Sequence, residues 1–293
     1  MRRILVTGAT GKQGSSVVHE LLKNNFEVYA LTRNPQSSIA DNLKKAGAIL
    51  VKGDLEDIKS LSEIFRKIDG LYLVLPPIWI SSKETDEREA DIGIQTIKLA
   101  ERQGVKFVLY SSVLGSDKQD IFRPRFKYTI EKYLLESDLL GAVIRPAFFM
   151  ENLFLPSFGL AEDKFVNPLP EEKAISWIST SDIGTFARII FQNYQGFNGK
   201  TVDFGGELLT PRQVLKLLEK KLNRSIDFVQ IPLEVLFQQS ETFAKLVEMI
   251  DKEGYDPIDY EFISTWIPEL ISFEQWMDNI GIKKIRELSS MNQ

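Results

Sequence analysis

The sequence contains no cysteine and a single histidine, His19, among its 293 residues. The absence of cysteine excludes disulfide bonds, thiolate nucleophiles and cysteine-ligated zinc. One histidine is too few for a histidine-rich metal site and makes a serine–histidine triad a poor explanation of any activity. We therefore expect no metal site, and we expect His19 to be solvated, because it lies off the apolar stripe of its predicted helix.

Long hydrophobic runs are also missing. The uninterrupted apolar stretches have the length of strands, whereas a membrane helix needs about 20 apolar residues. The apolar run near the N-terminus is too short for a secretory signal. These absences predict a cytoplasmic protein that does not enter a membrane.

The sequence has no excess of positive charge. Its net charge of −5 and pI near 5.3 argue against a dedicated nucleic-acid-binding protein. Residues 1–150 carry 22 basic and 19 acidic side chains, whereas the remaining residues carry 14 and 22. The first half therefore suits an anionic ligand, and the acidic second half suits a protein partner better than DNA.

The first half alternates strand-like and helix-like segments. Short apolar runs predict six strands at residues 4–6, 26–31, 49–51, 71–75, 107–110 and 142–144. Amphipathic helical patterns separate most of these runs. Strands that are apolar on both faces, with helices between them, predict an α/β fold with a doubly wound parallel sheet of the Rossmann type.

The alternation changes after residue 147. We place the Rossmann domain at residues 1–147 and a smaller α/β lobe, which does not fold independently, at residues 148–293. Residues 148–180 show no clean period and predict loop and short helix. Thr210 and Pro211 are typical of a helix start.

A glycine-rich segment, GATGKQG at residues 8–14, joins the first predicted strand to the first helix. Glycines permit the tight turn, let backbone amides approach a diphosphate, and bring the helix against the strand. The helix N-terminus offers unpaired N–H groups to the phosphates. The segment predicts dinucleotide binding and not a Walker loop, because Lys12 is followed by Gln13 where that loop has serine or threonine.

The end of the second predicted strand indicates which dinucleotide is bound. Arg33 stands where an NAD site usually has an acidic residue, about 20 residues beyond the glycines. A guanidinium suits a 2′-phosphate by its charge and its fork of donors, and Lys12 offers a second positive charge. We therefore predict NADP(H). Asp54, after the third strand, is expected either to accept a hydrogen bond from adenine or to cap the next helix.

The glycine segment together with LTRNP at residues 31–35 resembles the NmrA-like family of atypical short-chain dehydrogenases/reductases. Further matches lie at residues 108–111, 144–146, 151–153 and 273–276. The resemblance implies a Rossmann lobe that binds NADP(H) and a smaller lobe that closes a cleft. It implies an NADPH-dependent oxidoreductase acting on a small quinone-like or azo compound or, alternatively, a redox sensor that acts through a protein partner.

The resemblance to the short-chain dehydrogenase/reductase superfamily also implies a serine and a Tyr-x-x-x-Lys pair for proton transfer. Counted back from residues 145–146, the family's lysine aligns with Lys127, whereas the tyrosine and serine positions fall on Arg123 and Val113. Tyr128 and Lys132 have the family's spacing in a different register. The two registers lie on different helix faces, since one residue is about 100° of rotation.

Only one of these faces can address the cofactor, and we expect it to be the face of Lys127. Without a tyrosine acid, hydride transfer to a quinone remains feasible because orienting the nicotinamide supplies much of the catalytic effect. Water or Lys127 would then supply the proton. Tyr128 and Lys132 remain the alternative.

The segment after the sixth strand, residues 148–154, is rich in phenylalanine. It predicts a pocket wall for a flat molecule, with Phe149 and Asn152 facing the substrate; the alternative is packing between the lobes. The adjacent acidic residues Glu171 and Glu172 are expected at the surface. The predicted cofactor-binding residues are Gly8, Thr10, Gly11, Lys12, Gln13, Gly14, Arg33, Asp54, Leu75, Pro76, Lys127, Pro146 and Phe148.

Overall fold

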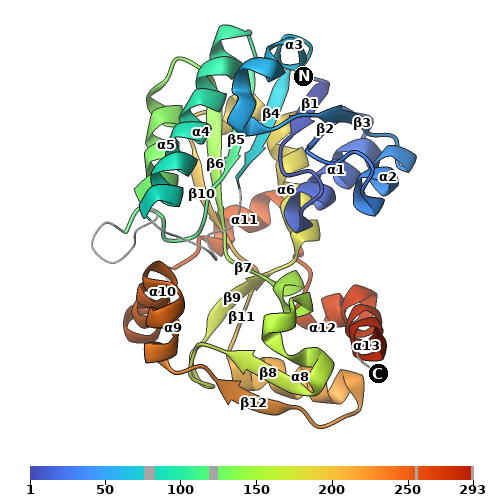
Figure 1. Ribbon diagram of the computed structural model, residues 1–293, viewed down its shortest axis with the longest axis vertical. Helices are drawn as coiled ribbons and strands as arrows, with labels where there is room; N and C mark the ends of the chain where they lie inside the picture. The colour runs from blue at the N-terminus through green and yellow to red at the C-terminus, as the bar shows by residue number, and fades with distance from the viewer. Residues whose placement is uncertain (76–82, 119–124, 255–256, 292–293) are drawn as a thin grey trace.

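The computed structural model describes residues 1–75, 83–118, 125–254 and 257–291. It has two lobes: the larger contains a seven-stranded sheet, and the smaller contains two short sheets (Figure 1). The larger sheet is parallel throughout and is covered by helices on both faces. This confirms the predicted α/β fold of the Rossmann type.

The seven strands follow the order β10-β6-β5-β4-β1-β2-β3. The chain runs outward from β1 in both directions, so the crevice between the carboxyl ends of β1 and β4 is where ligands bind in sheets of this kind. The strands are β1 (Arg3–Val6), β2 (Glu27–Thr32), β3 (Ile49–Lys52), β4 (Gly70–Val74), β5 (Phe107–Ser111), β6 (Gly141–Pro146) and β10 (Thr201–Phe204).

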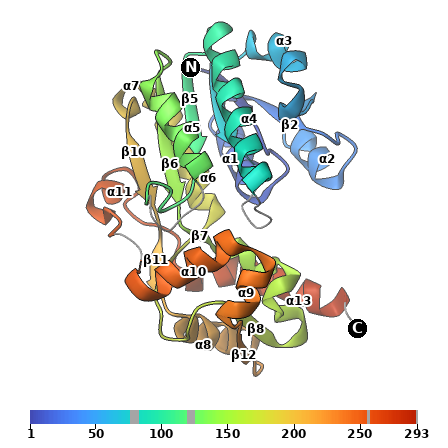
Figure 2. The ribbon, with the colours of Figure 1, turned by 60° about the vertical axis from the view of Figure 1, so that its left-hand side comes forward.

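Side chains alternate between the two faces of this sheet. Ile4 and Val6 of β1 point into one hydrophobic core, and Leu5 points into the other. Helices α1 and α6 cover the first face, whereas α4 and α5 cover the second (Figure 2). The helices of this lobe are α1 (Lys12–Lys23), α2 (Ser38–Lys45), α3 (Ser62–Phe65), α4 (Lys83–Arg102), α5 (Arg125–Glu136), α6 (Thr180–Gln192), α7 (Tyr194–Phe197) and α11 (Tyr260–Trp266).

The smaller lobe has its own core, in which Trp177 and Trp276 are fully buried. Its sheets have the orders β11-β9-β7 and β12-β8. Its strands are β7 (Phe148–Phe149), β8 (Lys164–Asn167), β9 (Ile175–Ile178), β11 (Glu207–Leu209) and β12 (Asp227–Gln230). Its helices are α8 (Pro211–Leu222), α9 (Leu233–Gln239), α10 (Glu241–Glu253), α12 (Phe273–Trp276) and α13 (Ile282–Met291).

Residues 148–180 differ from the prediction of loop and short helix. They contain β7, β8 and β9 together with three short 3₁₀ turns, the first of which is η2 (Met150–Phe154). The strands have only two, four and four residues. Strands this short do not display the alternation by which a sequence pattern is recognised.

The chain crosses between the lobes more than once, although the sequence predicts one division at 147/148. Strand β10 pairs with β6, α6 packs on α1, and Ile263 of α11 belongs to the core of the larger lobe. Residues 148–293 are therefore divided between two cores, because β10, α6 and α11 bury their apolar side chains against the large sheet. Within the described ranges, no helix is both long enough and apolar enough to cross a membrane.

Candidate functional site

The glycine segment forms a tight turn between β1 and α1. Gly8 has a φ of +55°, a conformation that L side chains rarely adopt. A Cβ on Gly14 would lie 2.2 Å from the carbonyl oxygen of Gly8, so the helix meets the turn too closely for any side chain. Gly11 is the N-cap of α1, and no side chain caps this helix end. The turn therefore presents backbone N–H groups to an anion.

Gln13 fastens this turn to the central strands. Its Oε1 accepts hydrogen bonds from the Tyr72 hydroxyl at 3.1 Å and from the Ser111 hydroxyl at 3.0 Å. Burial raises the pKa of Tyr72, so this hydroxyl remains a donor. Tyr72 and Ser111 were not predicted as site residues. Their positions in β4 and β5 were visible in the sequence, but their shared partner on α1 was not.

Lys12 reaches from the turn to the smaller lobe. Its Nζ donates a hydrogen bond to Asn152 Oδ1 at 3.1 Å. Burial lowers the pKa of Lys12, and the negative charge of Glu151 opposes this shift. The structure thus joins Lys12, predicted to contact the cofactor, with Asn152, predicted to contact the substrate. Thr10, which precedes Lys12 in the glycine turn, is half-buried.

Arg33 lies just beyond the end of β2 and is exposed. Its guanidinium makes no hydrogen bond or ion pair with the described residues.

Asp54 accepts a hydrogen bond from the backbone N–H of Glu56 at 3.1 Å and caps the short helix η1 (Leu55–Leu61). Of the two roles expected for Asp54, this is the capping of the next helix. Leu75 is buried after β4, and Pro76 lies outside the described residues.

Helix α5 turns Lys127 inward and Lys132 outward. Lys127 is 4% exposed, and its Nζ lies 2.5 Å from Glu89 Oε1 of α4. The side chain of Lys132 is 55% exposed and pairs with Glu136 at 3.8 Å. Tyr128 is half-buried on the same helix. Val113, which follows β5, is also half-buried. Arg123 lies outside the described residues.

The aromatic segment after β6 packs in two directions. Pro146 is buried at the end of β6. The Phe148 ring contacts Trp177 with ring centroids 4.9 Å apart, so it packs on the core of the smaller lobe. Phe149 packs on the core of the larger lobe, and both phenylalanines are half-buried. Asn152 is 6% exposed.

Two buried carboxyl groups, those of Glu151 and Asp182, were not predicted as site residues. Glu151 accepts hydrogen bonds from the backbone N–H of Thr180 at 3.1 Å and from Trp276 Nε1 at 3.0 Å. Burial raises the pKa of Asp182 to about 7, opposed by the N–H of Ile271 and reinforced by the charge of Glu151. The pair connects α6 to the C-terminal segment.

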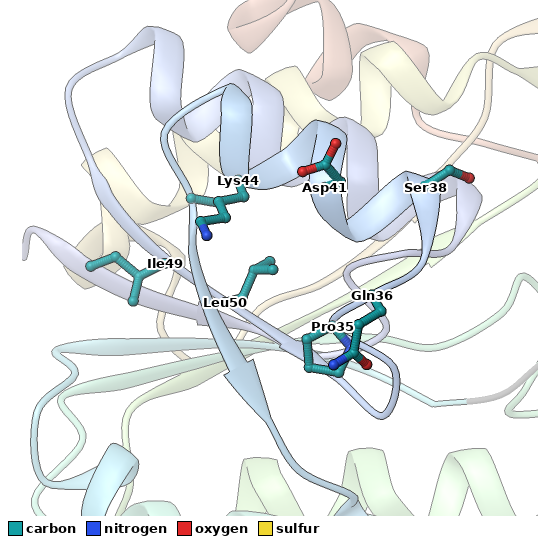
Figure 3. A pocket seen from close by; sticks show the side chains of 8 residues that line it. Pro35, Gln36, Ser38, Asp41, Lys44, Ile49 and Leu50 are labelled. Atoms are coloured by element: carbon teal, nitrogen blue, oxygen red, sulfur yellow. The ribbon is translucent and has the colours of Figure 1, made fainter.

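The remaining features are peripheral to these groups. An open hollow lies between α2 and β3 and is lined in part by Pro35, Lys44 and Leu50, but it contains none of the glycine turn (Figure 3). His19 is exposed, as predicted. No cluster of three metal-ligating side chains occurs within the described ranges.

The described residues therefore include a backbone anion site at the glycine turn, an exposed guanidinium just beyond β2, and a buried ammonium group on α5 that is paired with Glu89. Among the described residues these groups include no histidine, so lysine, hydroxyl and carboxyl groups are the side chains that could take part in proton transfer.

Comparison with known proteins identifies the family of this sequence. A profile of the NmrA-like family matches residues 1–277. An NmrA-like family domain-containing protein of Dictyostelium discoideum is 29% identical and covers 96% of this chain and 99% of its own. An NAD(P)H azoreductase of Xenophilus azovorans is 27% identical, covering 79% of this chain and 78% of its own. Quinone oxidoreductase 2 of Escherichia coli is 26% identical, covering 77% of this chain and 76% of its own.

Solved structures share the fold. NmrA, a negative transcriptional regulator in complex with NADP, has a TM-score of 0.76 at 18% identity and covers 98% of this chain and 97% of its own. An NADPH-dependent quinone oxidoreductase of Escherichia coli, complexed with NADPH, has a TM-score of 0.74 at 21% identity, with 95% and 99% covered. Both lobes are included in these matches.

Proposed function

This chain belongs to the NmrA-like family, and from that membership we propose that it is an NADPH-dependent reductase of a small planar acceptor such as a quinone or an azo compound. The observation that carries the proposal is the uncapped N-terminus of α1 behind a turn that only glycine fits. Relatives named azoreductase and quinone oxidoreductase support the acceptor class.

The glycine turn fits a dinucleotide diphosphate. Gly11 is exposed and Gly14 is buried against the Gly8 carbonyl, so the backbone lies open on one side and is tightly packed on the other. The N–H groups at the start of α1 would hold the diphosphate, because they lack partners within the helix. Gln13 keeps this helix end in place through Tyr72 and Ser111.

Arg33 supports the preference for NADP(H) over NAD(H). It is exposed at the end of β2, where the adenosine ribose lies in this fold, and it makes no ion pair within the described part of the chain. Its guanidinium would hold the 2′-phosphate through charge-assisted hydrogen bonds.

Lys127 supports the proposed proton transfer. When bound, NADPH supplies the hydride to the acceptor. Lys127 would hold the nicotinamide ribose and deliver a proton to the reduced acceptor, because it is the inward-facing ammonium of α5. Phe149 and Asn152 would form the acceptor wall, with Asn152 held by Lys12.

The test is NADPH consumption. Purified protein should oxidise NADPH in the presence of benzoquinones, naphthoquinones or azo dyes, and should do so faster than it oxidises NADH. A panel that gives no turnover with any acceptor would contradict the reductase function.

A second candidate is a redox sensor that binds NADP(H) and acts through a protein partner. The hydrogen bond between Lys12 and Asn152 favours it, because this bond links the nucleotide turn directly to the smaller lobe. The sensor requires that NADPH and NADP⁺ have different effects on oligomeric state or partner affinity. Light scattering with each nucleotide tests this, and identical behaviour with both would remove the candidate.

A further inference from the structure

Helices α4 and α5 enclose a group of polar side chains on one face of the sheet. The Lys127–Glu89 pair is buried, with 6% and 13% of the two side chains exposed. The Lys127 Nζ also lies 5.3 Å from the centre of the Phe126 ring. The Tyr110 hydroxyl of β5 is fully buried within range of the Glu89 charge, and it has no hydrogen-bond partner among the residues that the structure describes.

The carboxylates in this region have separate partners. Glu131, one helical turn beyond Lys127, accepts hydrogen bonds from Arg145 at 2.6 Å and from Ser116 at 2.5 Å. Glu131 is therefore paired with Arg145. Among the described residues, the ion-pair partner of Lys127 is Glu89. The charge of Glu89 also reaches Tyr110, whose pKa burial raises well above its usual value.

A buried ion pair is an expensive way to hold two helices together. Removing two charges from water costs several kcal/mol for each ion, and apolar residues of similar volume often serve as well. The same inward face of α5 already buries Ile130 and Leu134 in the core. Packing alone thus gives no reason for a lysine at position 127 or for a glutamate opposite it.

We infer that Glu89 is the positioning residue of Lys127: its carboxylate holds the Lys127 Nζ in the position from which it addresses the nicotinamide ribose and the acceptor. The inference rests on the proposed function for the role of Lys127. In the reaction, the acceptor gains a hydride from NADPH, which is oxidised to NADP⁺. An N–H bond of Lys127 breaks as an O–H or N–H bond forms on the acceptor, and water returns the proton to the amine.

Turnover in a double-mutant cycle tests this inference. The variants are Glu89→Ala, Lys127→Ala and the double variant, with Glu136→Gln as control because it removes a carboxylate from an exposed pair on α5. We expect Lys127→Ala to lower kcat roughly 100-fold, Glu89→Ala to lower it at least about 10-fold, and the double variant to match Lys127→Ala. Multiplicative losses in the double variant would overturn the inference.

Glu89→Gln removes the charge but keeps the size of the side chain, so this variant should fold even if Glu89→Ala does not. It should lower kcat more than it changes KM, and it should raise the solvent isotope effect on kcat as proton transfer becomes limiting. Restored turnover in Glu89→Asp would support the carboxylate requirement. A Glu89→Gln variant with wild-type kcat and isotope effect would contradict it.

A chemical readout separates this inference from the reductase function. Acetylation of Lys127 relative to Lys132, followed by mass spectrometry, should be slow in the wild type, slower with NADP⁺, and at least about threefold faster in Glu89→Gln; this factor corresponds to less than 1 kcal/mol. If no acceptor is reduced but this pattern appears, the reductase proposal fails and the positioning role stands. Equal acetylation in Glu89→Gln and Glu136→Gln would refute the positioning role even in an active reductase.

Discussion

Arg33 is the residue on which the proposed preference for NADP(H) depends. It is exposed and makes no ion pair with the described residues, so replacing it disturbs no internal contact. Its only proposed partner is the 2′-phosphate, which NAD⁺ lacks. The consequences of substitution should therefore differ between the two nucleotides.

The variant Arg33→Asp should weaken NADP⁺ binding by roughly 10- to 100-fold, because a charged hydrogen bond contributes about 1.5 to 3 kcal/mol. NAD⁺ binding should change little. Calorimetric titration of both nucleotides measures the difference, with Lys283→Asp as a control of equal charge change at an exposed site. Unchanged NADP⁺ affinity would place the 2′-phosphate elsewhere.

Asp182 gives the protein a pH dependence at the level of one residue. Burial raises the pKa of Asp182 to about 7 from an ordinary value of 3.8. Between these values the folded protein retains a proton that the unfolded chain has released. The free energy of unfolding therefore falls as pH rises through this window, and the loss is complete above about pH 7.

The variant Asp182→Asn should flatten this dependence. Its amide oxygen still accepts the Ile271 N–H bond, but the side chain never has to ionise. We expect it to be more stable than the wild type at pH 8 by on the order of 2 kcal/mol. Urea unfolding at pH 5 and pH 8 measures this, with exposed Asp138→Asn as the control. Parallel pH profiles for wild type and Asp182→Asn would argue against it.

At the scale of elements, the seating of α1 against β1 decides whether the phosphate site exists. The position of Gly14 over the Gly8 carbonyl brings the helix N-terminus to the end of the strand. The obstacle to a side chain here is backbone, which cannot move aside as a flexible side chain can. The packing of α1 against β1 thus depends on the absence of a Cβ atom at Gly14.

Gly14→Ala should therefore push α1 away from the turn. We expect a loss of about 1 to 3 kcal/mol in stability and a much larger relative loss of nucleotide binding. Gly196→Ala is the matched control, because a Cβ there meets nothing within 4 Å. Thermal unfolding and nucleotide titration of both variants provide the comparison; normal nucleotide binding by Gly14→Ala would show that the turn does not hold the diphosphate.

At the scale of the whole molecule, Lys12 connects the two lobes. Its ammonium group leaves the glycine turn of the larger lobe and donates to Asn152 in η2. The neighbour of Asn152 in the sequence, Glu151, accepts a hydrogen bond from Trp276 Nε1 in the C-terminal part of the chain. A nucleotide on the glycine turn would thus lie next to a contact that spans the crevice.

If the Lys12 charge serves the diphosphate, which both nucleotides share, and not the 2′-phosphate, Lys12→Met should weaken NADP⁺ and NAD⁺ binding by similar factors, about 10-fold each. This result would contrast with Arg33→Asp. Lys23→Met, at the opposite end of α1, serves as the control in the same calorimetric titrations. A selective loss of NADP⁺ binding would instead assign Lys12 to the 2′-phosphate.

Local pattern was sufficient for the Rossmann sheet and the glycine turn. These features follow from side-chain periodicity and from the conformational freedom of glycine, both of which act over a few neighbouring residues. The helical rotation between Lys127 and Lys132 is likewise a local property, and the structure gives them opposite exposures.

Folding in three dimensions added the contacts between distant segments. Glu89 lies 38 residues from Lys127, and Lys12 lies 140 residues from Asn152. The return of α6 and β10 to the large sheet and the burial of Asp182 beside Glu151 have the same origin. Periodicity shows which face of an element is buried but not which face it meets, because that partner is chosen by the packing of the whole chain.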